Sequence, residues 1–366
     1  MNRYTWIIAV IIAVLWWYYV VQSAWDSGLW IDAPVTSTAK TNTTPVSDTQ
    51  AVIKNNTPAW DSVTTTWITV NPYLDTTIDG SDLRFDKTLA TNSAYTRYQI
   101  SYMSNGLRIS GIMNIPTGVW PHPLVILNHG YIDPAVYTIW RWLKREQDYL
   151  ARNWYAVLHT DYRNHWWSDN DQNLIDDSYL RSKYYGIDAL NAIQAVRQAI
   201  SDKYEVLNNV DADRVWMMGH SMWGGVTMYG LVAHPQMIQA AVLYAPVHSN
   251  EYYNFNRWMI NRLSSAEYNA LQDKLWPLDQ IDTFASFSPE TYFDRVQTPV
   301  QIYFGTNDAS CPVQRGRDIR DQLTAADKSV ELIEYPWEQH EFGPQWTRFM
   351  QWVVQFFDNN LSSTTQ

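Results

Sequence analysis

The chain has 366 residues, 46% of them hydrophobic, so it is long enough to bury a core and is not disordered throughout. A formal net charge of −11 argues against nucleic acid or an anionic lipid surface as the main partner. A single cysteine, Cys311, excludes an intrachain disulfide. No Cys/His cluster has the spacing of a zinc site, so neither a metal nor another cofactor is expected.

Residues 1–25 are predicted to form a membrane anchor or a signal peptide. No charge occurs between Arg3 and Asp26, and residues 6–21 are almost wholly apolar. This apolar stretch is shorter than the roughly 20 residues of a comfortable span, and small residues near its end leave cleavage open. Arg3 predicts that the rest of the chain faces outward, anchored in the cell envelope or secreted. A buried core helix is the weaker alternative because the segment is terminal and precedes a linker.

Residues 26–66 are predicted to be a flexible linker. From Ala33 onward they are rich in Ser, Thr, Asn and Pro and have no sustained hydrophobic period. Such a composition is typical of a solvated tether that holds a domain away from a membrane.

Residues 67–366 are predicted to form one domain of the α/β class. Apolar runs predict strands, in chain order, over YQISYMS, LRISGIMNI, PLVILNHG, YAVLHTD, RVWMMG, QAAVLYA, VQIYFG and VELIEY. The turn Asn105–Gly106 joins the first two as a hairpin, and helical patterns separate most of the later ones. This order predicts a mainly parallel, twisted sheet with helices on both faces. Residues 247–298 are too many for a bare connection and are predicted to be a small helical cap insertion.

The segment VWMMGHSMWGG, residues 215–225, nearly matches the nucleophile turn G-x-S-x-G of serine hydrolases. Gly219 and Ser221 stand after an apolar strand and before a helix, which is the context that the motif requires. The turn lifts the serine hydroxyl off the end of the sheet and points the first helical N–H groups at a reacting carbonyl. Trp223 replaces the second glycine of the motif.

Two further residues complete a catalytic triad in the order serine, acid, histidine, which is the chain order of α/β-hydrolases. Asp308 follows a buried strand, and His340 lies in the loop between the last strand and the last helix. Serine needs a base to remove its proton, and the base needs a carboxylate to hold its tautomer. Asp279 and Asp282 are rival acids, although they belong to the predicted cap. A surface histidine and a turn-forming aspartate are the alternative interpretation.

The oxyanion hole is predicted where the strand PLVILNHG ends. The backbone N–H of Tyr131 follows Gly130 there and can act together with the N–H of Met222. At His129 and His220 we expect the backbone to matter more than the imidazole ring. An ordinary glycine turn is the alternative at Gly130.

From about residue 95 to residue 357 the chain resembles the catalytic domain of the prolyl oligopeptidase family and its acylaminoacyl-peptidase and dienelactone-hydrolase-like relatives. The segments that carry this resemblance are SNGLRISGIMNIP, PLVILNHG, DYRNHWWSD, DADRVWMMGHSMWGG, TPVQIYFGTNDASCPV and YPWEQHEF. The resemblance implies an α/β-hydrolase fold with Ser221 as nucleophile, Asp308 as acid and His340 as base. The chain departs from its relatives in two ways: it has no room for the β-propeller of the large peptidases, and it has serine where dienelactone hydrolases use cysteine.

Tryptophan is unusually frequent in this chain. It occurs 20 times and glycine 14 times, although glycine averages about 7% of residues. The sequences that the chain resembles usually have glycine at the positions of Trp223, Trp337 and at least one of Trp166 and Trp167. Glycine would also be natural at Trp154 and Trp216. At Trp258, Trp346 and Trp352 a real tryptophan is plausible.

We hypothesise that about a dozen of the tryptophan codons, such as those at the positions where glycine would be expected, are UGA codons. The organism would decode UGA as glycine, whereas it is read here as tryptophan. A chain folded as written should then have crowded or displaced indoles near Ser221 and His340, because an indole at position 223 would overpack the turn. The alternative is a truly tryptophan-rich chain with damaged catalysis.

The sequence therefore predicts a serine hydrolase that cleaves amide or ester bonds through an acyl-enzyme. A peptidase like those of the prolyl oligopeptidase family is favoured, and a carboxylesterase of the same fold is the close alternative. A non-catalytic, anchored binding protein is the alternative if Trp223 is genuine. The expected partners are a small peptide or ester substrate and a membrane contacted through residues 1–25.

Overall fold

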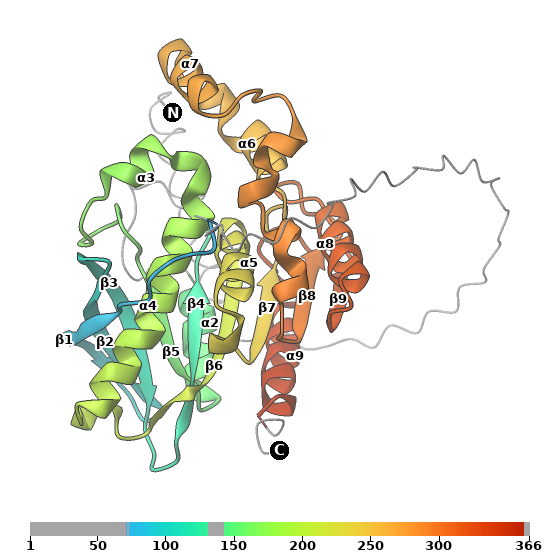
Figure 1. Ribbon diagram of the computed structural model, residues 1–366. Helices are drawn as coiled ribbons and strands as arrows, with labels where there is room; N and C mark the ends of the chain where they lie inside the picture. Colours follow the sequence, from blue (N-terminus) through green and yellow to red (C-terminus); the bar gives the residue numbers. More distant parts are fainter. Residues whose placement is uncertain (1–70, 72, 131–142, 362–366) are drawn as a thin grey trace, which may run out of the picture. The chain divides into compact units, whose positions relative to one another are not determined.

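The computed structural model describes residue 71 and residues 73–130 and 143–361 (Figure 1). The predicted leader and linker, residues 1–66, and the predicted oxyanion residue Tyr131 lie outside these ranges. No helix within the described ranges is both long enough and apolar enough to span a membrane.

The described strands form one sheet in the order β1-β2-β3-β5-β4-β6-β7-β8-β9. The strand β3 is antiparallel to β2 and β5, β1 is antiparallel to β2, and all pairs from β5 to β9 are parallel. The bounds are β1 Ser81–Thr91, β2 Tyr95–Ser104, β3 Leu107–Pro116, β4 His122–Asn128, β5 Ala156–Thr160, β6 Val210–His220, β7 Ala240–Tyr244, β8 Val300–Gly305 and β9 Val330–Tyr335. The edge strand β1 is an addition to the strands that the sequence predicted.

The predicted hairpin is present at the junction of β2 and β3. Ser104 pairs with Leu107, and the two turn residues between them have φ of +48° at Asn105 and +79° at Gly106. Positive φ at both central residues is the geometry that makes Asn-Gly the preferred two-residue hairpin turn.

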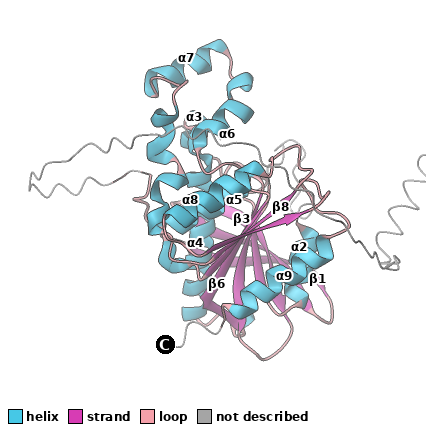
Figure 2. Ribbon diagram, turned by 90° about the vertical axis from the view of Figure 1, so that its right-hand side faces the viewer, coloured by secondary structure: helices cyan, strands magenta, loops and turns pink. Residues whose placement is uncertain are grey.

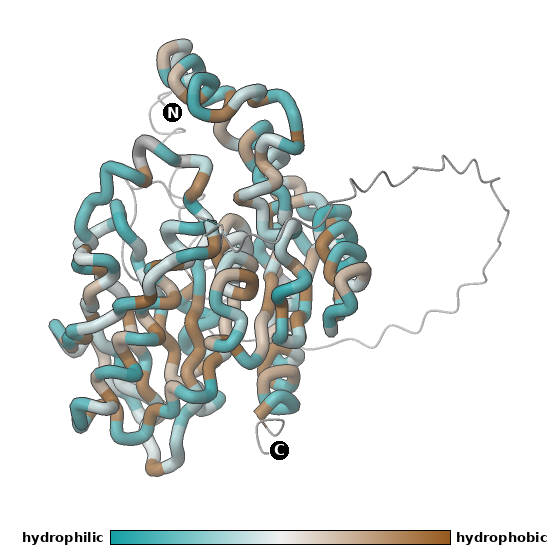
Figure 3. Tube along the Cα trace, viewed as in Figure 1, coloured by the Kyte–Doolittle hydropathy of each residue, from teal (hydrophilic) through white to brown (hydrophobic). Residues whose placement is uncertain are grey.

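Helices cover both faces of the sheet, as predicted. Figure 2 shows α2 (Lys144–Arg152) and α9 (Trp346–Asn359) on one side, with α4 (Arg181–Ser201), α5 (Met222–Ala233) and α8 (Gln314–Ala325) on the other. Every residue of β4, β5, β7 and β8 is buried. Hydrophobic residues accordingly concentrate along these central strands (Figure 3), which is typical of a parallel sheet buried on two sides.

The segment between β7 and β8 is helical, as the predicted cap insertion requires. It contains α6 (Glu251–Trp258), α7 (Ser265–Lys274) and several short 3-10 turns, and it stands above the sheet in Figure 1. The helix α7 begins with a capping box in which the Ser264 side chain accepts from Glu267 N and the Glu267 carboxylate accepts from Ser264 N. Its one buried residue is Leu271, so local capping rather than burial stabilises this outer helix.

Candidate active site

Ser221 occupies the sharp turn between β6 and α5, where the sequence placed it. Its backbone has φ +59° and ψ −127°, a conformation that L residues adopt where the surrounding structure enforces it. The turn depends on glycines on either side of it. A Cβ at Gly219 would lie 2.3 Å from Trp223 O, and a Cβ at Gly224 would lie 2.4 Å from Pro246 Cβ. Both positions therefore exclude every other residue type unless the backbone moves.

Backbone hydrogen bonds hold the strained turn in place. Ser221 N donates to Tyr244 O at 3.0 Å, and Ser221 O accepts from Gly224 N at 2.9 Å and from Val247 N at 3.0 Å. The serine is thus tied to the ends of β6 and β7, and its hydroxyl, which makes no hydrogen bond within the described ranges, is available to a partner.

Asp308 and His340 lie together, as the sequence predicted. They follow the neighbouring parallel strands β8 and β9, so their loops meet at the same edge of the sheet. His340 Nδ1 is 2.8 Å from Asp308 Oδ2, and the Asp308 side chain is fully buried. The other carboxylate oxygen accepts from Ser310 N and Cys311 N, both at 2.8 Å. Asp308 is therefore fixed from two sides and can orient the imidazole.

The rival acids Asp279 and Asp282 are not part of this cluster. Both are exposed in the helical segment between β7 and β8. No group of three His, Cys, Asp or Glu side chains in the described ranges could hold a metal ion.

Glu338 clamps the loop that carries His340, a role that the sequence analysis missed. Its buried carboxylate accepts from Gly343 N at 2.7 Å and from Gln345 N, so it closes the loop around His340. Its backbone C=O accepts from Asn307 N at 3.0 Å, next to Asp308. Glu338 thereby links the acid loop to the base loop.

His220 connects the nucleophile turn to His340. Its Nε2 is 3.0 Å from His340 O, and the two rings are 4.8 Å apart. Burial, reinforced by the nearby His340, lowers the pKa of His220 to about 3, so the ring is neutral near pH 7 and Nε2–H donates to the carbonyl. The expectation that His220 would matter through its backbone was therefore incomplete. Ser221 Oγ and His340 themselves are not hydrogen bonded in the part of the chain described here, and the His220 contact links their two loops.

One of the two predicted oxyanion donors can be located. Met222 is the first residue of α5 and follows Ser221 directly, and the first N–H groups of a helix have no acceptor within it. Gly130 lies against the nucleophile, since a Cβ there would be 3.2 Å from Ser221 Cβ. The second donor, the N–H of Tyr131, belongs to the peptide bond that follows Gly130.

Trp223 is fully buried against the His129 ring and creates a conflict there. Its Nε1–H points at His129 Nδ1 from 3.1 Å, while the same Nδ1 is 2.8 Å from Gly130 O. The first contact needs a lone pair on Nδ1, and the second needs a proton on it, so a single ring nitrogen cannot satisfy both. The indole is also packed against the Tyr162 and Tyr185 rings, with centroids 5.0 and 4.5 Å away. Crowding at the nucleophile turn thus takes the form of incompatible hydrogen bonds.

Three other tryptophans have left-handed backbones. The φ angle is +70° at Trp154, +50° at Trp166 and +68° at Trp337. Their exposed fractions are 58%, 41% and 85%, so the indole next to the His340 loop is displaced into solvent, as expected. Left-handed φ is costly for bulky residues and free for glycine, which agrees with the hypothesis about these positions. Trp167 is exposed as well, and Trp216 is buried with an Nε1 that has no partner among the described residues.

Comparisons with known proteins identify the family of the chain. Residues 179–364 match the prolyl oligopeptidase family. The chain is 24% identical over 296 residues to the uncharacterized peptidase YuxL of Bacillus subtilis, covering 75% of this chain and 41% of YuxL. It is 25% identical over 224 residues to the acylamino-acid-releasing enzyme of Sus scrofa, covering 60% of this chain and 28% of that enzyme. The chain thus spans less than half the length of these two relatives.

Among solved structures, the chain is similar to acetyl xylan esterase 1 from Thermoanaerobacterium. The TM-score is 0.55 at 17% identity, and the match covers 77% of this chain and 89% of the esterase. At this identity the similarity concerns the fold, which is that of the α/β-hydrolases, as predicted.

Proposed function

Because the chain belongs to the prolyl oligopeptidase family and is a serine hydrolase, we propose that it cleaves small peptides or esters through an acyl-enzyme on Ser221. In this reaction Ser221 Oγ attacks the substrate carbonyl while His340 Nε2 takes its proton. Asp308 holds the imidazole and stabilises the cation that forms. The N–H groups of Met222 and Tyr131 stabilise the oxyanion. His340 then gives the proton to the leaving group. Water, deprotonated by His340, next attacks the acyl-enzyme carbonyl, and His340 returns that proton to Ser221 Oγ as the acid is released.

The observation that carries this proposal is the 2.8 Å contact between His340 Nδ1 and Asp308 Oδ2. It lies at the sheet edge where the strained turn presents Ser221, and it leaves His340 Nε2 as the atom that can act as base. A surface histidine beside a turn-forming aspartate would have no reason to show a fully buried carboxylate with two further backbone donors.

Within this class we favour a peptidase, with a carboxylesterase as the second candidate. The peptidase is supported by the family match and by relatives named as a peptidase and an acylamino-acid-releasing enzyme. The esterase is supported by the similar structure of an acetyl xylan esterase, which the chain matches over nearly the whole esterase. Turnover of a panel of chromogenic peptides and esters separates the two.

A fluorophosphonate probe tests the serine chemistry itself, since it phosphonylates a serine that a neighbouring base activates. We expect labelling of the full chain, loss of labelling in Ser221→Ala, and retention in Ser329→Ala, a control at an exposed serine. An intact, folded chain that resists the probe would instead favour a binding protein on a hydrolase fold.

We also propose that residues 1–25 direct the protein to the cell envelope, with residues 26–66 as its tether. The charge-free apolar stretch after Arg3 supports this. Recovery of the full chain from membranes or from the medium is expected, whereas recovery from the cytosol would contradict the proposal.

A further inference from the structure

Arg315 carries a buried positive charge that no carboxylate of the described residues pairs with. It lies in the first turn of α8 and is 9% exposed. The one hydrogen bond of its side chain within the described ranges runs from Nη1 to the sulfur of Cys311 at 3.5 Å. A guanidinium does not lose its proton in proteins, and a buried charge without a partner is costly. An anion that approaches this group is therefore stabilised.

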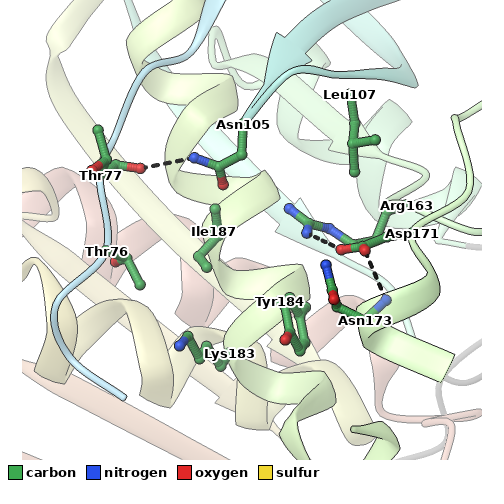
Figure 4. Close-up of a pocket in the computed structure, with 10 residues that line it drawn as sticks. All are labelled: Thr76, Thr77, Asn105, Leu107, Arg163, Asp171, Asn173, Lys183, Tyr184 and Ile187. Carbon is green, nitrogen blue, oxygen red and sulfur yellow. Dashed lines mark hydrogen bonds and ion pairs between the residues drawn. The ribbon is translucent and has the colours of Figure 1, made fainter. Parts of the chain in front are cut away.

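The other buried arginines of the described ranges have better acceptors. Arg163, at the edge of a cavity of about 420 Å³, is bound to Asp171 at 2.6 Å (Figure 4) and to Asp188 at 2.7 Å. Arg97 donates to two amide oxygens, at 2.9 and 3.2 Å. A thiol is a weak acceptor by comparison, so Arg315 is the buried arginine whose charge is left without a strong partner.

Arg257 places a second positive charge near the first. It is exposed on α6 and forms no ion pair with the described residues. Burial raises the pKa of the Cys311 thiol to about 12, while the charges of Arg315 and Arg257 act on it in the opposite direction, so both groups lie close to this thiol. Burial lowers the pKa of Arg315, and the like charge of Arg257 lowers it further. The two guanidinium groups repel each other, and a bound anion relieves that repulsion.

Arg257 also connects the loop of the catalytic acid to a cavity beside the nucleophile. Its Nη2 donates at 2.9 Å to the backbone oxygen of Ala309, the residue after the acid. Its Cζ is 4.9 Å from the centroid of the Trp258 ring, and Trp258 lines a cavity of about 50 Å³ together with Met222, which follows Ser221. The Nε and Nη1 atoms of Arg257 have no acceptor among the described residues, so they are available to a substrate.

The carboxylates close to the two arginines are engaged elsewhere. Asp308 accepts from the catalytic histidine and from two backbone N–H groups. Asp318, one turn further along α8, accepts from Gln314 Nε2 at 2.8 Å and is 3.8 Å from His248 Nε2. Neither carboxylate forms an ion pair with either arginine in the part of the chain that the structure describes.

We propose that Arg257, reinforced by the charge of Arg315, binds a carboxylate group of the substrate. The planar guanidinium suits a carboxylate, because its N–H groups match the spacing of the two oxygens. The enzyme then favours substrates with an acidic group near the scissile bond over neutral substrates of the same shape. This inference rests on the proposed function, because the carboxylate belongs to the molecule that Ser221 attacks.

Paired esters that differ in charge test the inference. Mono-p-nitrophenyl adipate has a carboxylate in its acyl group, and its methyl ester does not. We expect the ratio of their kcat/KM values, charged over neutral, to fall about three- to tenfold in Arg257→Gln, because a charge-assisted hydrogen bond is lost. The intrinsic reactivities cancel because the same pair is compared in both proteins. The ratio should not change in Arg320→Gln, which removes an equal charge from an exposed pair with Asp321 further along α8.

A second pair places the charge difference in the leaving group. The acetate esters of p-hydroxybenzoic acid and of methyl p-hydroxybenzoate are compared in the same way. A fall with either pair supports the inference and shows which part of the substrate carries the carboxylate. Unchanged ratios with both pairs, or equal falls in Arg257→Gln and Arg320→Gln, would overturn it and leave the serine hydrolase in place. Absence of both ester turnover and fluorophosphonate labelling in the wild-type chain would overturn the two together.

Discussion

The acid–base half of the site and the nucleophile half tolerate tryptophan very differently. Around His340, buried groups form the framework: Asp308 accepts three hydrogen bonds, and Glu338 closes the loop with two more. Trp337 lies in this loop with its indole 85% exposed, so it does not disturb the framework. At the nucleophile turn, Trp223 is fully buried and competes for the His129 nitrogen. An indole in a surface turn can point into solvent, whereas an indole buried inside the nucleophile turn cannot.

Backbone conformation and indole exposure also separate two kinds of tryptophan in this chain. Trp346 lies in a helix, and its Nε1 donates to Glu146 at 2.6 Å, as suits a residue selected for its side chain. At Trp154, Trp166 and Trp337 the backbone is left-handed and the indole is exposed, which is the geometry of a glycine position. The backbone at these three positions therefore has the conformation that glycine favours, although the residue that stands there is tryptophan.

The largest expected effect is on catalysis when the buried indole is removed. With glycine at position 223, His129 Nδ1–H can donate to Gly130 O alone and orient the peptide bond whose N–H is the proposed oxyanion donor. We expect kcat/KM of Trp223→Gly to rise about 10²-fold, the size of effect that an ångström-scale misplacement has in an active site. Steady-state kinetics on a chromogenic ester, with Trp352→Gly as the control, measure it.

A genuine tryptophan gives the opposite result. Deleting a fully buried indole would then leave a cavity, cost about 3–5 kcal/mol of unfolding free energy and bring no gain in activity. The codon for residue 223 decides the matter directly, since UGG there ends the hypothesis that UGA is decoded as glycine.

Much of the fold could be predicted because buried parallel strands have continuous apolar sequences. Asp308 and His340 were predictable as partners because Asp308 follows the buried strand β8, His340 follows the next strand β9, and neighbouring parallel strands end at one edge of the sheet. The strand β1 was missed because it is an edge strand with three register irregularities and mostly exposed residues, so its sequence does not alternate cleanly. The roles of Glu338 and His220 could not be derived either, because both act on backbone groups that only the folded loops bring within reach.

An intermediate effect on catalysis is expected when Glu338, whose carboxylate holds the His340 loop, is changed. In Glu338→Gln the side chain has one oxygen for the N–H groups of Gly343 and Gln345, so one of them loses its acceptor. We expect kcat to fall about tenfold with KM unchanged, because the substitution moves the histidine that acts in the chemical step and leaves the groups that bind the substrate in place. Glu334→Gln is the matched control: this residue on β9 pairs with Arg317 at a partly exposed surface, and its loss should leave kcat unaltered. Equal kinetics in the two variants would mean that Asp308 alone positions His340.

The smallest effect is on stability and distinguishes the two kinds of tryptophan by its sign. Trp337 has φ +68° and an indole that is largely in solvent, so Trp337→Gly removes backbone strain and little packing; we expect a gain of about 1 kcal/mol in unfolding free energy. Trp352 lies inside α9, where the same substitution should cost about 1 kcal/mol through helix propensity. Guanidinium chloride unfolding of the two variants measures both values. Losses of stability in both variants would mean that the contacts of the Trp337 indole stabilise the fold by more than the backbone strain destabilises it. The distinction between tryptophans at left-handed, exposed positions and tryptophans within helices would then fail.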